Sequence, residues 1–412
     1  MKRKLAGAIK IIILILIFLS ALFLFVYNSK ITNTGFPRKI LSPMGNSFSI
    51  MSLLKSRHVP KKIIYGYLPY WSIPDTKYIQ LDKLTDIAYF GVYLNEDGTF
   101  MDKLEDNTAE PGLLAWHENE ALDELVARAK SAGVRVSLTV ISHNDEVSDK
   151  FLDCKECWAN FITNVEKEMD SKKIRDLNLN FEYVDFTKKE TAAKYSEFVS
   201  FTNTELDKKY GGSLVVVSTF ADSLVKDRVT DINSLGKVAD MIFIMGYDFH
   251  RPDSDKAGPV APIDGKGVYS EYDVRTMLND YVAVMPPSKI ILGVPYYGYN
   301  WVVKQGEPNA ERIPGDDDIG YSQSQTYAKI MDTILEIKPE LKWDDLGKSS
   351  YFTYLSPETG SIREVYFEND KSLEVKYQLI NEYNLGGVGM WAIGYDGGYQ
   401  ELWELLAKYF IK

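Results

Sequence analysis

The segment RDLNLNFEYVDF, residues 175–186, places a single carboxylate, Glu182, at the end of a run in which polar and apolar side chains alternate. This period of two predicts a β-strand with Asn178, Asn180 and Glu182 on one face and apolar side chains on the other. Three polar groups facing a protein interior are costly unless they bond one another or a ligand. Glu182 is therefore a candidate general acid, and a structural carboxylate is the alternative for such a residue taken alone.

Other strand-like runs end in side chains suited to binding a sugar. MGYDFH, residues 245–250, supplies Tyr247 and Asp248, and GGVGMWAIGYD, residues 386–396, supplies Trp391. An aromatic ring at the end of a strand can stack on the apolar face of a sugar, although core packing is the ordinary role of such a ring. Further aromatic candidates are Tyr67, Tyr70, Trp71, Tyr296, Tyr297 and Trp301.

Eight apolar runs rich in β-branched and aromatic residues recur through the chain, and most are separated by stretches with helical periodicity. They span residues 63–71, 85–94, 133–141, 176–184, 213–221, 239–249, 289–298 and 386–396. Strand and helix repeated eight times predict an α/β fold, a closed (βα)8 TIM barrel with helices outside. In such a barrel the chemistry lies at the C-terminal ends of the strands.

The interval between the seventh and eighth runs is longer than a returning helix requires. It contains a helix-like piece, YAKIMDTILEIKPEL, and two strand-like pieces joined by PETGS. We expect a small α+β insertion at residues 302–368 within a barrel domain spanning 63–412.

These motifs together resemble glycoside hydrolase family 18, the family of chitinases, endo-β-N-acetylglucosaminidases and spore-germination members. Glu182 is similar to the last residue of the family's DxxDxDxE row, and MGYDFH resembles the sixth-strand motif. The runs YGYLPYW, GVPYYGYNW and GGVGMWAIGYD resemble the first, seventh and eighth strands. The resemblance covers about residues 63–410.

The resemblance implies substrate-assisted retaining hydrolysis of β-1,4-linked N-acetylglucosamine glycans, which include chitin-like, peptidoglycan and N-glycan substrates. It implies catalytic roles for Glu182, Asn180 and Tyr247, and substrate-binding roles for Asn178, Asp248, Trp391, Tyr67, Trp71, Tyr296 and Trp301. The three aspartates of the row are replaced by Arg175, Asn178 and Asn180. Without a neighbouring aspartate, burial would have to keep Glu182 protonated. The alternative to an enzyme is a non-hydrolytic glycan-binding protein with the same barrel.

The N-terminus has a basic start followed by an apolar run from Ile11 to Tyr27 that contains no charged residue. This pattern favours a transmembrane signal anchor at residues 1–28 over a cleaved signal peptide. Residues 29–62 are predicted to be a linker. We expect a single-pass cell-membrane protein with an extracytoplasmic catalytic domain, or a secreted protein if the segment is cut.

Composition sets the remaining expectations. A net charge of −11 argues against a nucleic-acid partner. Cys154 and Cys157 provide too few ligands for a zinc site, and a local disulfide is plausible in an exported chain. We expect no cofactor, no metal and a monomer. His143 and Asn144 follow the third strand and could line the cleft, although a lone histidine in a loop is more often merely solvated.

Overall fold

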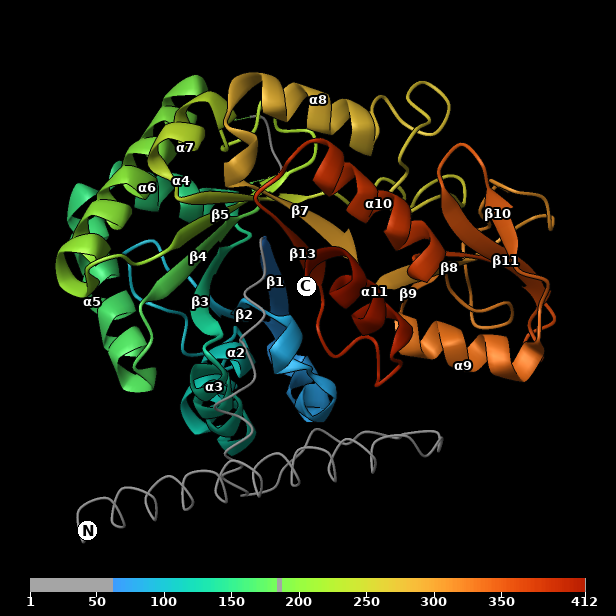
Figure 1. Ribbon diagram of the computed structural model, residues 1–412, viewed down its shortest axis with the longest axis horizontal. Coiled ribbons are helices and arrows are strands. Elements are labelled where there is room, and N and C mark those ends of the chain that lie inside the picture. The colour runs from blue at the N-terminus through green and yellow to red at the C-terminus, as the bar shows by residue number, and fades with distance from the viewer. Residues whose placement is uncertain (1–61, 184–186, 412) are drawn as a thin grey trace, which may run out of the picture. The chain divides into compact units, whose positions relative to one another are not determined.

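The computed structural model describes residues 62–183 and 187–411, and its centre is a closed barrel of eight parallel strands (Figure 1). The neighbour order around the barrel is β1-β13-β7-β6-β5-β4-β3-β2. The strands are β1 (Ile63–Pro69), β2 (Asp86–Tyr93), β3 (Arg135–Ser142), β4 (Asp176–Phe181), β5 (Val215–Phe220), β6 (Met241–Met245), β7 (Ile290–Pro295) and β13 (Gly387–Trp391). The predicted TIM barrel is confirmed, with all eight strands inside the predicted runs or within one residue of them.

Helices follow the strands and surround the barrel (Figure 1). They are α2 (Pro111–Glu118), α3 (Glu120–Ala132), α4 (Asp145–Asp153), α5 (Lys155–Lys172), α6 (Lys189–Tyr210), α7 (Ile232–Val238), α8 (Val274–Val284), α10 (Asp370–Glu382) and α11 (Glu401–Phe410). Short 3-10 helices occur at η2 (Tyr70–Tyr78), η3 (Leu81–Lys83) and η4 (Pro287–Lys289). Local sequence sets the ends of α3, which begins at the Asn119 cap and ends at Gly133 with φ of 71°.

The predicted anchor and all but the last residue of the predicted linker lie outside the described residues. Within the part of the chain that is described, no helix combines the length and the apolar character that crossing a bilayer requires.

Strand β4 has the two faces that its alternation predicts. Leu177, Leu179 and Phe181 are buried in the core between the barrel and its helices. The Phe181 ring lies 4.9 Å from that of Tyr195 and 6.0 Å from that of Phe198, both on α6. The opposite face therefore directs Asn178 and Asn180 into the barrel.

Aromatic rings fill much of the barrel interior. Tyr67 packs edge-on against Phe243, with their ring centres 4.8 Å apart. Two glycines make room for the Phe243 ring, since a Cβ atom would lie 2.2 Å from it at Gly389 and 2.6 Å from it at Gly293. The interior is thus a packed core that supports the site at the C-terminal ends of the strands.

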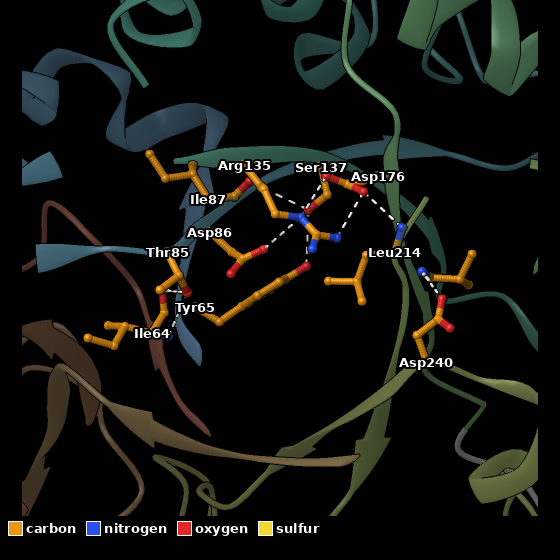
Figure 2. A network of polar contacts seen from close by, with 11 residues as sticks. Ile64, Tyr65, Thr85, Asp86, Ile87, Arg135, Ser137, Asp176, Leu214 and Asp240 are labelled. Carbon is orange, nitrogen blue, oxygen red and sulfur yellow. Dashed lines mark hydrogen bonds and ion pairs between the residues drawn. The ribbon is translucent and has the colours of Figure 1, made fainter. Parts of the chain in front are cut away.

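An ionic network closes the opposite end of the barrel, where the strands begin (Figure 2). The Arg135 guanidinium makes two 3.0 Å hydrogen bonds to Asp176 and lies 3.5 Å from Asp86. Asp176 also accepts a hydrogen bond from the backbone N–H of Leu214. Three neighbouring strands, β2, β3 and β4, are therefore joined at their first residues by buried carboxylates and one arginine.

The insertion after β7 is a five-stranded antiparallel sheet with one helix, in the order β10-β11-β12-β8-β9. Its elements are β8 (Tyr297–Val302), β9 (Gln323–Thr326), α9 (Tyr327–Ile337), β10 (Lys342–Asp344), β11 (Ser349–Leu355) and β12 (Ile362–Phe367). The sheet includes residues from 297, so the predicted start at 302 is late. The predicted seventh strand in fact divides at Tyr296, where the chain leaves the barrel.

Cys154 and Cys157 form a disulfide, with 5.2 Å between their Cα atoms. It lies at the start of α5, where the Cys154 sulfur also accepts the backbone N–H of Cys157. The local pairing expected for the CxxC sequence is confirmed.

Candidate active site

Glu182 lies one residue beyond β4 and meets two polar neighbours. Its Oε1 accepts a 2.9 Å hydrogen bond from Asn180 Nδ2 and lies 3.2 Å from His143 Nε2. The same His143 nitrogen is 3.3 Å from Asn180 Nδ2. About 30% of the Glu182 side chain remains exposed. The carboxyl group is thus held in place on one side and open to the cavity on the other.

Burial is the largest influence on the pKa of Glu182, and it raises that pKa. The hydrogen bond and charge of His143, the Asn180 hydrogen bond and the charge of Arg251 act in the opposite direction. Together they outweigh burial and lower the pKa below its ordinary value. The expectation that burial keeps Glu182 protonated is therefore wrong for the free protein.

Asn178 lies deeper in the barrel than Asn180. It is fully buried, and its Nδ2 donates to the Val216 carbonyl at 3.2 Å and to Ser218 Oγ at 3.3 Å. Ser218 Oγ in turn lies 2.7 Å from the Tyr67 hydroxyl. Asn178 therefore supports the floor of the cavity, and the predicted substrate contact is corrected because the cavity does not reach this side chain.

Tyr247 and Asp248 follow β6 as the sequence predicts. Asp248 Oδ1 accepts hydrogen bonds from the hydroxyls of Tyr297 and Tyr299, the latter at 2.6 Å. Burial raises the pKa of Asp248 despite these bonds and the nearby positive charge of Arg251. Burial also raises the pKa of Tyr247 well above its ordinary value, so this tyrosine carries its proton and can donate a hydrogen bond.

Four aromatic residues form a wall beside Glu182. The rings of Trp391 and Phe90 meet edge-on with 4.7 Å between centres, and Tyr67 lies 5.5 Å from Trp391. Trp71 is 47% exposed, and its Nε1–H donates to the Tyr395 hydroxyl at 3.0 Å. Partly exposed rings anchored in this way can stack on the apolar face of a sugar ring.

A cavity of about 670 Å³ lies beside these groups at the C-terminal ends of the strands. A cavity of this volume can hold a small oligosaccharide. Its lining includes Glu182, Asn180, Tyr247, Asp248, Trp391, Tyr67 and Tyr297 from the sequence-predicted set, together with Phe90, Ser218, Phe220, Ala221, Asp222, Lys226, Arg228, Met245, Phe249, Arg251, Ser270, Glu271 and Tyr272.

Three predicted aromatic sugar-binding residues do not line this cavity: Trp71, which is exposed, and Tyr296 and Trp301, which are buried. Tyr296 is fully buried, and its hydroxyl lies 3.2 Å from that of Tyr377 on α10. Trp301 is fully buried inside the insertion, where its Nε1–H donates to the Arg251 carbonyl. The predictions for these two buried residues are corrected, because a ring with no exposed face cannot stack on a ligand.

Sequence reasoning missed Phe90 and Arg251, and it left His143 without a role. Phe90 lies inside a strand whose residues are buried on both faces, so no periodicity marks it. Arg251 follows the end of β6 by six residues, in a loop whose path the sequence does not reveal. For His143, the available indication was its position directly after the third strand.

Within residues 62–183 and 187–411, no cluster of three or more histidine, cysteine, aspartate or glutamate side chains could hold a metal ion.

Comparisons with known proteins identify the family and the fold. The model of the family "Glycosyl hydrolases family 18" matches residues 63–396. The cortical fragment-lytic enzyme of Bacillus anthracis is 26% identical over 332 residues, which cover 79% of this chain and 68% of the relative. Human di-N-acetylchitobiase is 25% identical over 305 residues, covering 69% and 75%. The Group IV chitinase of Ostrinia furnacalis, solved with allosamidin, shares the fold at a TM-score of 0.70, with 19% identity over 84% of this chain and 97% of that chain.

Proposed function

The chain belongs to glycosyl hydrolase family 18, and from that premise we propose that it hydrolyses glycans containing N-acetylglucosamine, with Glu182 as acid and base. In the first step the 2-acetamido oxygen of the substrate attacks the anomeric carbon, and Glu182 protonates the departing glycosidic oxygen. In the second step Glu182 removes a proton from water, which opens the oxazoline at the anomeric carbon. Configuration is retained after two displacements.

The observation that carries this proposal is the contact between Asn180 Nδ2 and Glu182 Oε1 at 2.9 Å. Because the nitrogen and oxygen of an amide point apart, the Asn180 oxygen remains available to the N–H of a substrate acetamide. Asn180 can therefore orient the attacking group while it holds the acid. It carries no negative charge, so the intermediate would be closer to a neutral oxazoline than to an oxazolinium ion.

The aromatic wall, together with Tyr247 and Asp248 after β6, suits the rest of the sugar. Trp391 offers a ring for stacking, and Tyr247 offers a hydroxyl that stays protonated. The relatives named a cortical fragment-lytic enzyme and a di-N-acetylchitobiase support peptidoglycan or chitin-like oligosaccharides as substrates. N-glycans also contain N-acetylglucosamine, so they belong to the same proposed class of substrates.

A non-hydrolytic glycan-binding protein is the second candidate. The observation that favours it is the replacement of both inward aspartates by Asn178 and Asn180, which leaves the acid without a carboxylate neighbour on β4. The presence of Glu182 at the open side of the cavity favours the enzyme, since binding alone does not require an acid.

The test is turnover of a fluorogenic tri-N-acetylchitotrioside and release of reducing ends from peptidoglycan by the full-length chain. Glu182→Gln keeps the size of the side chain and removes its proton, so we expect turnover to fall by at least about a hundredfold. Glu156→Gln makes the same change on the exposed face of α5 and should keep full activity. Binding of chitin or peptidoglycan without turnover in the wild type would instead support the binding protein.

We also propose that residues 1–28 anchor the protein in the cell membrane with the barrel outside the cytoplasm. The supporting pattern is the basic start followed by the apolar run to Tyr27. Membrane fractionation with an alkaline carbonate wash, combined with protease accessibility on intact cells, tests both parts of this proposal. Extraction by carbonate, or protection of the barrel, would overturn it.

A further inference from the structure

Arg251 lines the same cavity as Glu182 and is held there by its backbone. Its carbonyl accepts the Nε1–H of Trp301 at 3.0 Å and the backbone N–H of Ser254 at 3.0 Å. Its own N–H donates to Ser254 Oγ at 2.9 Å. The base of this side chain is therefore fixed between the β6 loop and the insertion, while the side chain itself is exposed.

The guanidinium of Arg251 is not bonded to any other described part of the protein, since it makes no hydrogen bond or ion pair among the described residues. It lines the same cavity as Glu182 and Asp248, and its positive charge acts to lower the pKa of both carboxyl groups. Neither of these carboxyl groups needs it as a partner, since Asn180 and His143 bond the first and two tyrosines bond the second.

The other cations of the cavity differ from Arg251. Arg228 makes two hydrogen bonds to Asp222, at 2.9 and 2.6 Å, and Lys226 lies 3.4 Å from the same carboxylate. Both cations therefore have the carboxylate of Asp222 as an ion-pair partner within the protein. Among the described residues, Arg251 is the cavity-lining cation that forms no ion pair at bonding distance.

We propose that Arg251 is a specificity-determining residue that binds a carboxylate on the glycan, so that the preferred substrate is an acidic glycan bearing a carboxylate close to the bond that is cut. This inference rests on the proposed function and deepens it. A guanidinium and a carboxylate form paired, charge-assisted hydrogen bonds, which hydroxyl and acetamide groups cannot replace. The aromatic wall serves neutral and acidic sugars alike, so Arg251 carries the discrimination.

The magnitude follows from the exposure of the site. Hydrogen bonds between charged groups are stronger than neutral ones, but water weakens an exposed pair. We expect the carboxylate to improve affinity by roughly tenfold relative to an uncharged analogue of the same shape. Because the interaction is between charges near the surface, this preference should decrease as salt concentration rises.

The experiment measures binding by isothermal titration calorimetry to the full-length chain in the Glu182→Gln background, which prevents turnover. The probes are the disaccharide of N-acetylglucosamine and N-acetylmuramic acid, the same disaccharide with its lactyl carboxylate converted to an amide, and neutral tri-N-acetylchitotriose. We expect the acid to bind roughly tenfold more tightly than the amide, and Arg251→Gln to abolish this difference while leaving the amide affinity within about twofold. Arg251→Lys should keep part of the preference, because it keeps the charge but loses the paired geometry.

Lys226→Gln is the matched control, because it removes a cavity cation whose counter-ion is internal and should keep the preference. Equal affinity for acid and amide, or a preference that survives Arg251→Gln, would overturn the inference. Turnover in the wild-type chain is measured separately on the same sugars. Hydrolysis without a preference for the acid would refute the role of Arg251 alone, and a preference without hydrolysis would refute the proposed reaction alone.

Discussion

Replacing Asn180 by aspartate would place a second carboxylate against the acid. Asn180 Nδ2 lies 2.9 Å from Glu182 Oε1. At that separation two unit charges repel by about 6 kcal/mol at an effective dielectric constant of about 20, which corresponds to about 4 pKa units. This is an upper limit, because the carboxylates can rotate apart and share a proton, and His143 offsets part of the repulsion. We therefore expect the pKa of the acid to rise in the variant, by less than this upper limit.

The direction is set by two changes that act together. The Asn180 hydrogen bond now lowers the pKa of Glu182, and the variant replaces it with a like charge that raises it. In Asn180→Asp the alkaline limb of kcat/KM, which reports loss of the proton from the free acid, should therefore move to higher pH. The assay is the pH profile of kcat/KM on a fluorogenic tri-N-acetylchitotrioside. Asn144→Asp is the control, since Asn144 caps α4 and makes no contact with Glu182. An unmoved alkaline limb in Asn180→Asp would refute the reasoning.

Three further outcomes follow from the described contacts. Trp391→Ala should raise KM roughly tenfold with a smaller change in kcat, whereas Tyr296→Phe, in the core, should leave KM unchanged; steady-state kinetics decide. Burial raises the pKa of Asp86 to about 6, so the folded protein binds a proton at Asp86 at higher pH than the unfolded chain does. The free energy of unfolding should therefore increase by up to about 3 kcal/mol as pH falls from about 6 to 4. Urea unfolding at several pH values should show that Asp86→Asn loses this pH dependence. Lys376→Met leaves the Glu368 carboxylate buried without its 2.7 Å partner and should cost about 3–5 kcal/mol, which Glu368→Leu in the same chain should largely restore in urea unfolding.

The barrel could be predicted because each strand carries its own signal. Eight apolar runs, each bounded by turns and helices, need no knowledge of distant contacts, and the alternation in β4 assigns its faces directly. The error occurred at Tyr296, where the apolar and aromatic character continues unbroken from β7 into β8. Periodicity within a run cannot reveal that the chain has left one sheet for another, since both strands are buried.

The site was predictable only where a residue's role follows from its own strand. Glu182, Tyr247 and Trp391 line the cavity because strand ends in a closed parallel barrel converge. The lowered pKa of Glu182 was not predictable, because it depends on His143 after β3 and Arg251 in the loop after β6. Three segments far apart in sequence set this proton affinity, and their distances are a property of the fold.

The positive charge of Arg251 links substrate choice to the strength of the acid. In the free protein this charge helps to lower the pKa of Glu182. A substrate carboxylate bound to the guanidinium would offset that positive charge, so the acid would hold its proton to higher pH in the complex. The alkaline limb of kcat, which reports the complex, should therefore lie at higher pH for a muramic-acid substrate than for its amide. In Arg251→Gln the alkaline limbs for the two substrates should coincide. Coincident limbs in the wild type would refute this link between Arg251 and the pKa of Glu182.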